Sequence, residues 1–265
     1  MLQKEWMDDG LKNALWNAAY RRFWMYYADH PGQPAASIFE GRLLIALWTE
    51  HFNRALDELN PFFHPALGAI KKGFVASDWA SVYDFVEFIA NYDIVNRSSG
   101  PFIADCNTVL EKHLSAYRFV GTTLAPITSD EEIAAIEQAV TQGGRFGPVA
   151  VHVQTALTRL ADRAAPDFRN SIKESISAVE AACQIITGDP TATVGKALKQ
   201  IGVHPALEKG FSAIYGYTSD AQGIRHALLE EPNVDVDDAK FFLVSCAAFA
   251  NYLITKSASG STSTP

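Results

Sequence analysis

The chain has 265 residues, of which 48% are hydrophobic and 11% aromatic, enough to fill one large core or two ordinary ones. Its formal net charge of −8 excludes a protein that holds long duplex DNA by charge alone, because such binding needs many Lys and Arg contacts to phosphates. This net charge is still compatible with a local binding site for single-stranded RNA. No uninterrupted apolar run approaches the roughly 20 residues that cross a bilayer, and MLQKEWMDDG lacks a signal-peptide pattern, so we expect a cytoplasmic protein without a membrane span.

The cysteines and the familiar catalytic motifs bear on cofactors. Cys106, Cys183 and Cys246 lie far apart in apolar surroundings, with no CxxC pair, which predicts buried reduced thiols and no zinc site. The sequence contains no GxxxxGK(S/T), GxSxG, HExxH or GxGxxG motif, which disfavours nucleotide hydrolysis, serine esterase, zinc protease and dinucleotide chemistry. We therefore expect neither a metal nor a cofactor.

Apolar residues recur at helical spacing through most of the chain, and strand-like alternation is scarce, so we expect a mainly α fold. Trp6, Trp16, Phe23 and Trp24 enrich the first of the expected helices. In the first half the pattern predicts helices at about 5–28, 37–59 and 101–115, a short one after Pro65 and another after Ser77.

A small β-hairpin and a domain boundary are expected next. YRFVGTTLAPITS (117–129) has short β-branched runs around a glycine, which is typical of a hairpin. Ser129 and Glu132 form a capping box that predicts a new helix. GGRFGP (143–148) is the most breaker-rich stretch in the middle of the chain, so the first domain is predicted to span 1–145.

The second half is predicted to be an α-helical bundle at 146–256, followed by a disordered tail at 257–265. Gly188 is expected to end its second helix, and Ser219 with Gln222 forms another capping box that predicts a helix start at about Asp220. The helices are expected at about 147–164, 167–187, 192–201, 205–216, 219–231 and 236–256.

The segment YGYTSDAQGIRHALLEE (215–231) could carry chemistry. On a helix His226 shares a stripe with Glu230 and two small residues, and Arg225 lies on the neighbouring stripe, so the two could flank a groove. An imidazole can move a proton from a ribose 2′-hydroxyl, and a guanidinium can hold the phosphate, without a metal. The alternative is that His226 pairs with Glu230, and Arg225 with another carboxylate, as surface or interface ion pairs.

Other polar residues are weaker candidates. Arg169 and Asn170 open the predicted helix 167–187, and Glu180 lies beside its core face as the acid expected to point partly inward. Asp8 with Asp9, and Glu131 with Glu132, stand near helix starts and are expected to be caps. Arg145 and His152 are separated by six residues across glycine and proline, a spacing we interpret as coincidence. Besides Arg169 and Asn170, the candidate substrate-binding residues are Tyr217, Ser219 and Asp220.

Three stretches of the second half, DFRNSIKESISAVEAACQIITG, ATVGKALKQIGVHPALEKGFSAIYGYTSDAQGIRHALLEE and AKFFLVSCAAFANYLITK, resemble the HEPN domain of bacterial abortive-infection proteins of the AbiJ type. The first half, LKNALWNAAYRRFWMYY through AYRFVGTTLAPITSDEEIAAIEQAV, resembles one of the amino-terminal domains fused to it. Together these stretches cover about residues 5–256.

The resemblance implies a bundle that forms a homodimer, with two Arg and His motifs meeting in one cleft, and a metal-independent endoribonuclease. His226 matches the motif histidine and Glu180 an acidic position that orients it. The family motif has its Arg a few residues before the His, where this chain has Ser219, Asp220 and Ala221 instead and an adjacent Arg225.

We therefore expect a HEPN-like ribonuclease of anti-phage defence or a toxin system, with His226, Arg225, Glu180 and Glu230 as its catalytic residues and RNA as its partner. The alternative is a noncatalytic dimeric module that binds RNA or a partner protein through the same groove. A helical scaffold without a ligand is the third possibility.

Overall fold

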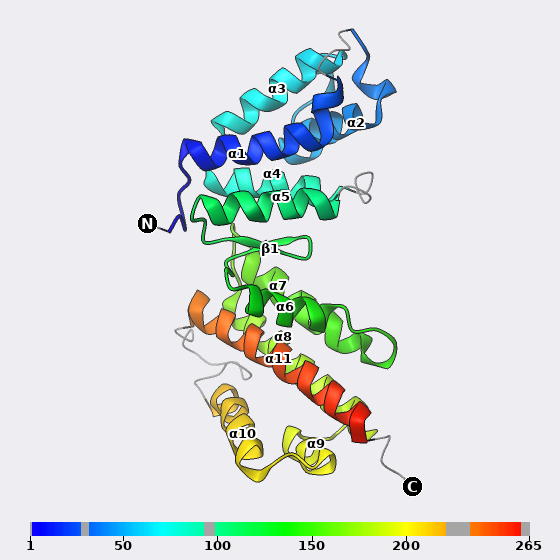
Figure 1. Ribbon diagram of the computed structural model, residues 1–265, viewed down its shortest axis with the longest axis vertical. Coiled ribbons are helices and arrows are strands. Elements are labelled where there is room, and N and C mark those ends of the chain that lie inside the picture. Colours follow the sequence, from blue (N-terminus) through cyan, green and yellow to red (C-terminus); the bar gives the residue numbers. More distant parts are fainter. Residues whose placement is uncertain (1, 28–31, 93–98, 221–233, 261–265) are drawn as a thin grey trace. The chain divides into compact units, whose positions relative to one another are not determined.

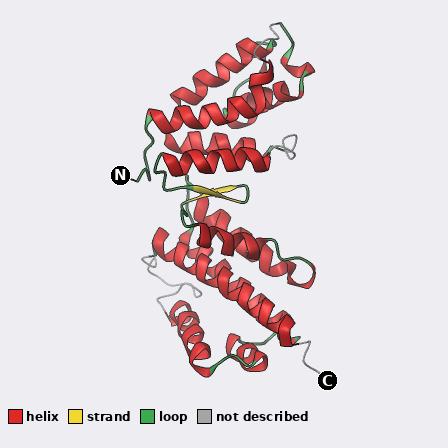
Figure 2. Ribbon diagram, viewed as in Figure 1, coloured by secondary structure: helices red, strands yellow, loops and turns green. Residues whose placement is uncertain are grey.

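A computed structural model describes residues 2–27, 32–92, 99–220 and 234–260, whose regular elements are helices apart from one short hairpin (Figure 1). Figure 2 shows the same balance of helix and strand, and the predicted mainly α fold is confirmed. The chain divides into two compact units, 1–128 and 129–265.

The first unit contains five α-helices within its described residues. Several end in, or are joined by, short π-helical or 3₁₀ turns. The α-helices are α1 (Asp9–Ala19), α2 (Phe39–Ala46), α3 (Phe63–Ala76), α4 (Trp79–Asn91) and α5 (Ser99–Lys112). The turns are Tyr20–Trp24, Met25–Tyr27, Ala35–Ser37, Leu47–His51 and Leu56–Glu58.

Helix α1 begins later than the sequence predicted. Asp8 caps it, because its carboxylate accepts a hydrogen bond of 2.7 Å from the backbone N–H of Leu11. Gln3 holds this cap in place, since its side-chain oxygen accepts from the backbone N–H of Asp8 at 2.7 Å. The predicted helix start near residue 5 was therefore wrong, and Trp6 lies outside the helix with 44% of its surface exposed.

Replacing Asp8 by alanine should lower the free energy of unfolding by about 1 kcal/mol, because the N–H of Leu11 loses its partner at the helix start. Asp8→Asn keeps a side-chain oxygen and should retain most of that stability. Chemical denaturation of the two variants measures the difference. Equal losses in both would show that the cap is not the source of the stability.

The second predicted helix also ends earlier than expected. Its helical turns stop at His51, and Asn53 adopts a left-handed backbone with φ of 49°, so the helix predicted to reach 59 was wrong. The helix expected after Pro65 instead starts at Phe63. Pro65 fits in its first turn, because the backbone N–H groups there have no intrahelical partner to lose.

The core of the first unit is built from aromatic rings. Trp16, Trp24, Phe74 and Phe85 are all at most 5% exposed. Ring centroids lie 5.4 Å apart for Trp16 and Trp24, and 4.8 Å apart for Phe74 and Phe85. These rings come from α1, the turn that follows it, α3 and α4, so a single cluster joins elements that are distant in the sequence.

The predicted hairpin is confirmed. Strands β1 (Arg118–Val120) and β2 (Thr123–Ala125) pair antiparallel, and Gly121 in the turn has φ of 58°, which glycine adopts at little cost. Side chains of two helices hold the strands. Asn107 of α5 accepts from the N–H of Phe119 at 2.8 Å, and Glu87 of α4 accepts from the N–H of Leu124 at 2.8 Å.

The second unit is a helical bundle. Helix α8 packs along α7 and α11, and α6 packs on α11 and α7. Of the residues expected on the core face of α8, Ile172, Ile176, Val179 and Cys183 are buried, and Ile186 is only partly buried. The helices are α6 (Asp130–Val140), α7 (Gly147–Ala161), α8 (Phe168–Thr187), α9 (Val194–Ile201), α10 (Pro205–Asp220) and α11 (Val236–Gly260), with a 3₁₀ turn at Gly144–Phe146.

Two helix boundaries lie where the sequence predicted them. Ser129 caps α6 by accepting a hydrogen bond from the N–H of Glu132 at 3.3 Å, and Gly188 ends α8 with φ of 68°. Because α6 packs on α11, the compact units divide at 128 rather than near the breaker-rich 143–148. The assignment of functional domains to 1–145 and 146–256 stays a prediction.

Two other predicted boundaries were wrong. Helix α10 runs without a break through Ser219 to Asp220, so no helix starts at Asp220. Gly216 stands inside α10, where a glycine weakens a helix by about 1 kcal/mol without ending it. Helix α11 continues to Gly260, where a tail was expected from 257.

Helix α11 is, by length and composition, apolar enough over Val236–Ala258 to cross a membrane. A core helix meets the same criterion, and α11 packs on α8, α6 and α7 within its unit. Its residues Leu243, Ala247 and Leu253 are fully buried in these contacts. We therefore interpret α11 as a core helix.

The three cysteines are free and buried, as predicted. Burial raises the pKa of the Cys246 thiol to about 12. Burial, with a smaller contribution from Glu180, raises that of Cys183 to about 12 as well. These thiols therefore stay protonated near neutral pH and contribute to packing.

Candidate functional site

The central residues of the predicted site lie outside the described part of the chain. These are Arg225, His226 and Glu230. Tyr217, Ser219 and Asp220 belong to the last turns of α10, and their side chains are not described either. The described site residues are therefore Glu180, Arg169 and Asn170.

Glu180 of α8 is bound by a tyrosine of α10. The hydroxyl of Tyr215 donates to Glu180 Oε1 at 2.5 Å, and both residues are half-buried. Glu180 was expected to be the one acid of this helix that points partly inward, but Glu174 of α8 is half-buried as well. Helix α10 also contacts α11, where the ring of Phe211 of α10 stacks parallel to that of Phe249. No residue of α10 from 205 to 216 is fully buried. The Tyr215–Glu180 hydrogen bond and the Phe211–Phe249 stacking are contacts that attach α10 to α8 and α11.

Arg169 and Asn170 lie at the other end of α8. Asn170 serves the helix start, because its backbone N–H and its side-chain amide donate to the carboxylate of Asp167 at 3.1 and 2.7 Å. With a rise of 1.5 Å per residue, Arg169 lies roughly 16 Å from Glu180 along the helix axis. The structure therefore does not bring Arg169 and Asn170 beside Glu180.

A histidine and a carboxylate that the sequence analysis did not connect form a pair in the second unit. Nδ1 of His152 on α7 lies 2.6 Å from Glu174 Oε2 on α8. Both side chains are partly exposed, at 36% and 27%. Only the packing of α7 on α8 brings them together, so no spacing within the sequence could have indicated the pair.

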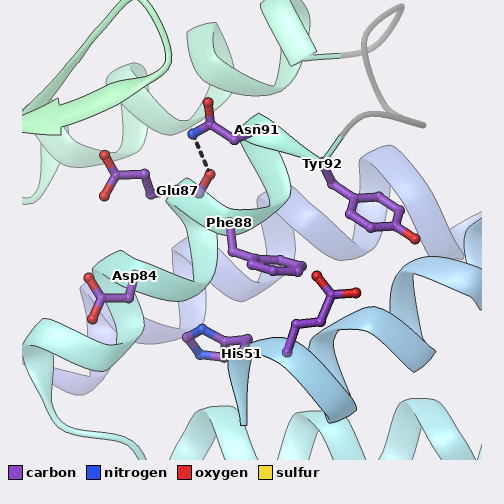
Figure 3. Close-up of a pocket in the computed structure, with 7 residues that line it drawn as sticks. His51, Asp84, Glu87, Phe88, Asn91 and Tyr92 are labelled. Carbon is purple, nitrogen blue, oxygen red and sulfur yellow. Dashed lines mark hydrogen bonds between the residues drawn. The ribbon is translucent and has the colours of Figure 1, made fainter. Parts of the chain in front are cut away.

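The first unit contains an open cavity of about 740 Å³ beside α4 (Figure 3). Four of its lining residues come from α4, Tyr92 directly follows the last residue of that helix, and the others come from the turn Leu47–His51 that follows α2. Figure 3 shows His51 approaching α4 next to Asp84 and Phe88. The lining residues are Glu50, His51, Asp84, Glu87, Phe88, Asn91 and Tyr92.

The cavity is acidic and has an aromatic wall. Burial lowers the pKa of His51, and the charge of Asp84 opposes this only in part, so the imidazole is neutral near pH 7. Its ring packs edge-on against Phe85 at 5.5 Å between centroids. Burial and then the charge of Glu50 raise the pKa of Tyr92.

Asn91 and Glu87 give this wall a fixed geometry. The side-chain amide of Asn91 donates to the backbone oxygens of Glu87 at 2.9 Å and Thr122 at 3.0 Å, while Glu87 holds β2. Among the described residues, no group of three or more His, Cys, Asp or Glu is placed to hold a metal ion. None of the cavity residues is among the site residues predicted from the sequence, because acidic and aromatic residues recur on many helix faces.

His51 should make the stability of the protein depend on pH. Below its ordinary pKa of 6.5 the unfolded chain takes up a proton that the folded chain resists, so the free energy of unfolding should fall as the pH drops from 7 through this range. His51→Gln should flatten that dependence. Thermal denaturation at several pH values checks this, and the same slope in both proteins would contradict it.

The fold and its sites define a mainly helical protein with two units, one of which carries an acidic cavity. Residues 1–142 match the family model for AbiJ N-terminal domain 4, and the chain belongs to this family. Membership indicates a setting of abortive-infection defence. Comparison with curated proteins and with solved structures gave no match. The match ends at 142, so the HEPN-like nature of the second half stays a prediction.

Proposed function

We propose that this protein is an RNA endonuclease of abortive-infection defence, or a related toxin, that cleaves RNA without a metal through Arg225 and His226. The observation that carries the proposal is the placement of α10. In a chain of the AbiJ family, this helix is bound to Glu180 of α8 and leads directly into the segment that contains Arg225 and His226. Glu180 and the helix that precedes the proposed catalytic segment in the sequence are thereby joined within one helical bundle.

The chemistry follows from the two side chains. The neutral imidazole of His226 removes the proton of a ribose 2′-hydroxyl, whose oxygen then attacks the adjacent phosphorus. The bond from phosphorus to the 5′-oxygen breaks, and that oxygen takes up a proton from solvent water as it leaves, while His226 releases the 2′-hydroxyl proton to solvent afterwards. Arg225 binds the phosphate and offsets the charge that develops on it. The products are a 2′,3′-cyclic phosphate and a 5′-hydroxyl.

Because Arg225 and His226 are adjacent in the sequence, we expect that a second cation, or a second copy of the chain, is needed to bind the phosphate that His226 acts beside. The sequence predicts a helix over this segment, and neighbouring residues on a helix point about 100° apart, so we do not expect one copy to direct both groups at the same phosphate along the same line. We propose a homodimer through the second unit, in which two such pairs share a cleft. Light scattering on the purified chain should give twice the monomer mass, and a monomer would leave no composite cleft.

Incubation of the purified chain with total RNA in EDTA tests the activity. The proposal expects shortened RNA in the wild type and intact RNA with His226→Ala of equal fold and purity. Cleavage that persists unchanged in His226→Ala would reject this site.

A noncatalytic RNA- or protein-binding module is the second candidate. The observation in its favour is that the Arg of the family motif, which stands a few residues before the His, is replaced here by Ser219, Asp220 and Ala221. This candidate expects saturable RNA or protein binding that depends on Arg225, with no cleavage by the wild type under any of these conditions.

A further inference from the structure

The cavity beside α4 has the charge of a site for a positively charged molecule. Glu50, Asp84 and Glu87 contribute carboxylates, and none of the described lining residues is Lys or Arg. His51 adds no positive charge near neutral pH, because burial lowers its pKa. The charge of Arg42 also acts on Tyr92, but the three carboxylates outnumber it, so the lining has a net negative potential that attracts cations.

The wall of the cavity suits the hydrocarbon part of such a cation. Phe88 lies on α4 and Tyr92 directly follows the end of that helix, and their rings are stacked, at 5.8 Å between centroids and 25° between planes. Figure 3 shows Phe88 on the same side of α4 as His51, facing the turn that follows α2. Aromatic faces attract ammonium groups and also cover methylene chains.

A bare metal ion fits this lining poorly. Metal ions need several ligands that converge on one point, and no three acidic or histidine side chains of the described residues do so. The cavity of about 740 Å³ is also far larger than an ion. Acids that are spread around a large, partly aromatic cavity match a cation whose charges are spread along a chain.

We propose that this cavity binds an aliphatic polyamine, with its ammonium groups at Glu50, Asp84 and Glu87 and its methylene chain against Phe88 and Tyr92. The site would give the first unit a small-molecule ligand of its own, independent of any RNA cleavage by the second unit.

Isothermal titration of the full-length protein with spermidine tests the proposal. The wild type should bind one spermidine saturably. Glu50→Gln should weaken binding about tenfold or more, because it removes one carboxylate partner of the amine. Phe88→Leu should also weaken it, since the apolar volume stays but the aromatic face is lost.

Glu111→Gln is the matched control, because Glu111 is an exposed acid of α5 in the same unit and does not line the cavity. It should leave the spermidine affinity unchanged. Equal weakening by Glu111→Gln would mean that spermidine responds only to overall charge, and this would overturn the proposal. Absence of saturable binding by the folded wild type, or displacement of spermidine by an equal concentration of Mg²⁺, would overturn it as well.

Discussion

His226→Ala is expected to lower the rate of RNA cleavage in EDTA by a factor on the order of 10²–10⁴, the usual contribution of a positioned acid or base. Without the imidazole no group at that position takes the proton from the 2′-hydroxyl. Arg225→Ala should also lower the rate, because the phosphate loses its cation. Arg225→Lys should recover only part of it, since a lysine cannot donate two parallel hydrogen bonds. Initial rates on a labelled RNA measure all three variants.

His152→Ala provides a matched histidine control. It removes an imidazole from the same unit, where His152 contacts Glu174 on the surface of α7 and α8. Its cleavage rate should equal that of the wild type. If His152→Ala lost activity while His226→Ala kept it, the catalytic site would have to be sought around the His152 and Glu174 pair.

Phe85→Ala is expected to lower the free energy of unfolding by about 3–5 kcal/mol, the second large effect. Phe85 is 1% exposed and its ring contacts those of Trp16, Phe74 and His51, so its removal leaves a hole that several elements border. Urea denaturation measures the loss. Phe85→Leu should cost less, because it keeps most of the apolar volume.

The control for this prediction is Val75→Ala on the neighbouring helix α3. Val75 is 52% exposed, so truncating it should change the free energy of unfolding by less than about 0.5 kcal/mol. A loss of less than about 1 kcal/mol in Phe85→Ala would contradict a rigid aromatic core.

The sequence predicted helices well where a local signal sets a helix end. Ser129 accepts a hydrogen bond from a backbone N–H at its own helix start, and Gly188 adopts the left-handed backbone that ends its helix, so their residue types alone predict those ends. The hairpin at 117–129 follows from β-branched residues around a glycine for the same local reason.

Two predicted helix starts failed where a second local arrangement competes with the expected one. Ser219 has the spacing of a capping box, yet α10 continues through it. When the preceding residues are already helical, their carbonyl groups accept from the backbone N–H groups that a capping residue would otherwise bind. Trp6 looked like part of a helix face, but the Asp8 cap supported by Gln3 starts the helix after it.

The candidate sites depended still more on tertiary structure. Glu180 was expected to point inward from its place beside the core face of α8, and its partner Tyr215 could not be predicted, since α10 had to be docked first. The acidic cavity joins His51 to Asp84 across two elements far apart in the sequence. Periodicity describes one helix at a time and does not report such contacts.

The chemical ends of the RNA fragments test the central claim most directly. If His226 activates the 2′-hydroxyl, fragments made in EDTA should carry a 2′,3′-cyclic phosphate and a 5′-hydroxyl, and a 2′-deoxy substitution at the cleaved position should block the cut. Fragments with 5′-phosphates that form only when Mg²⁺ is present would contradict the account.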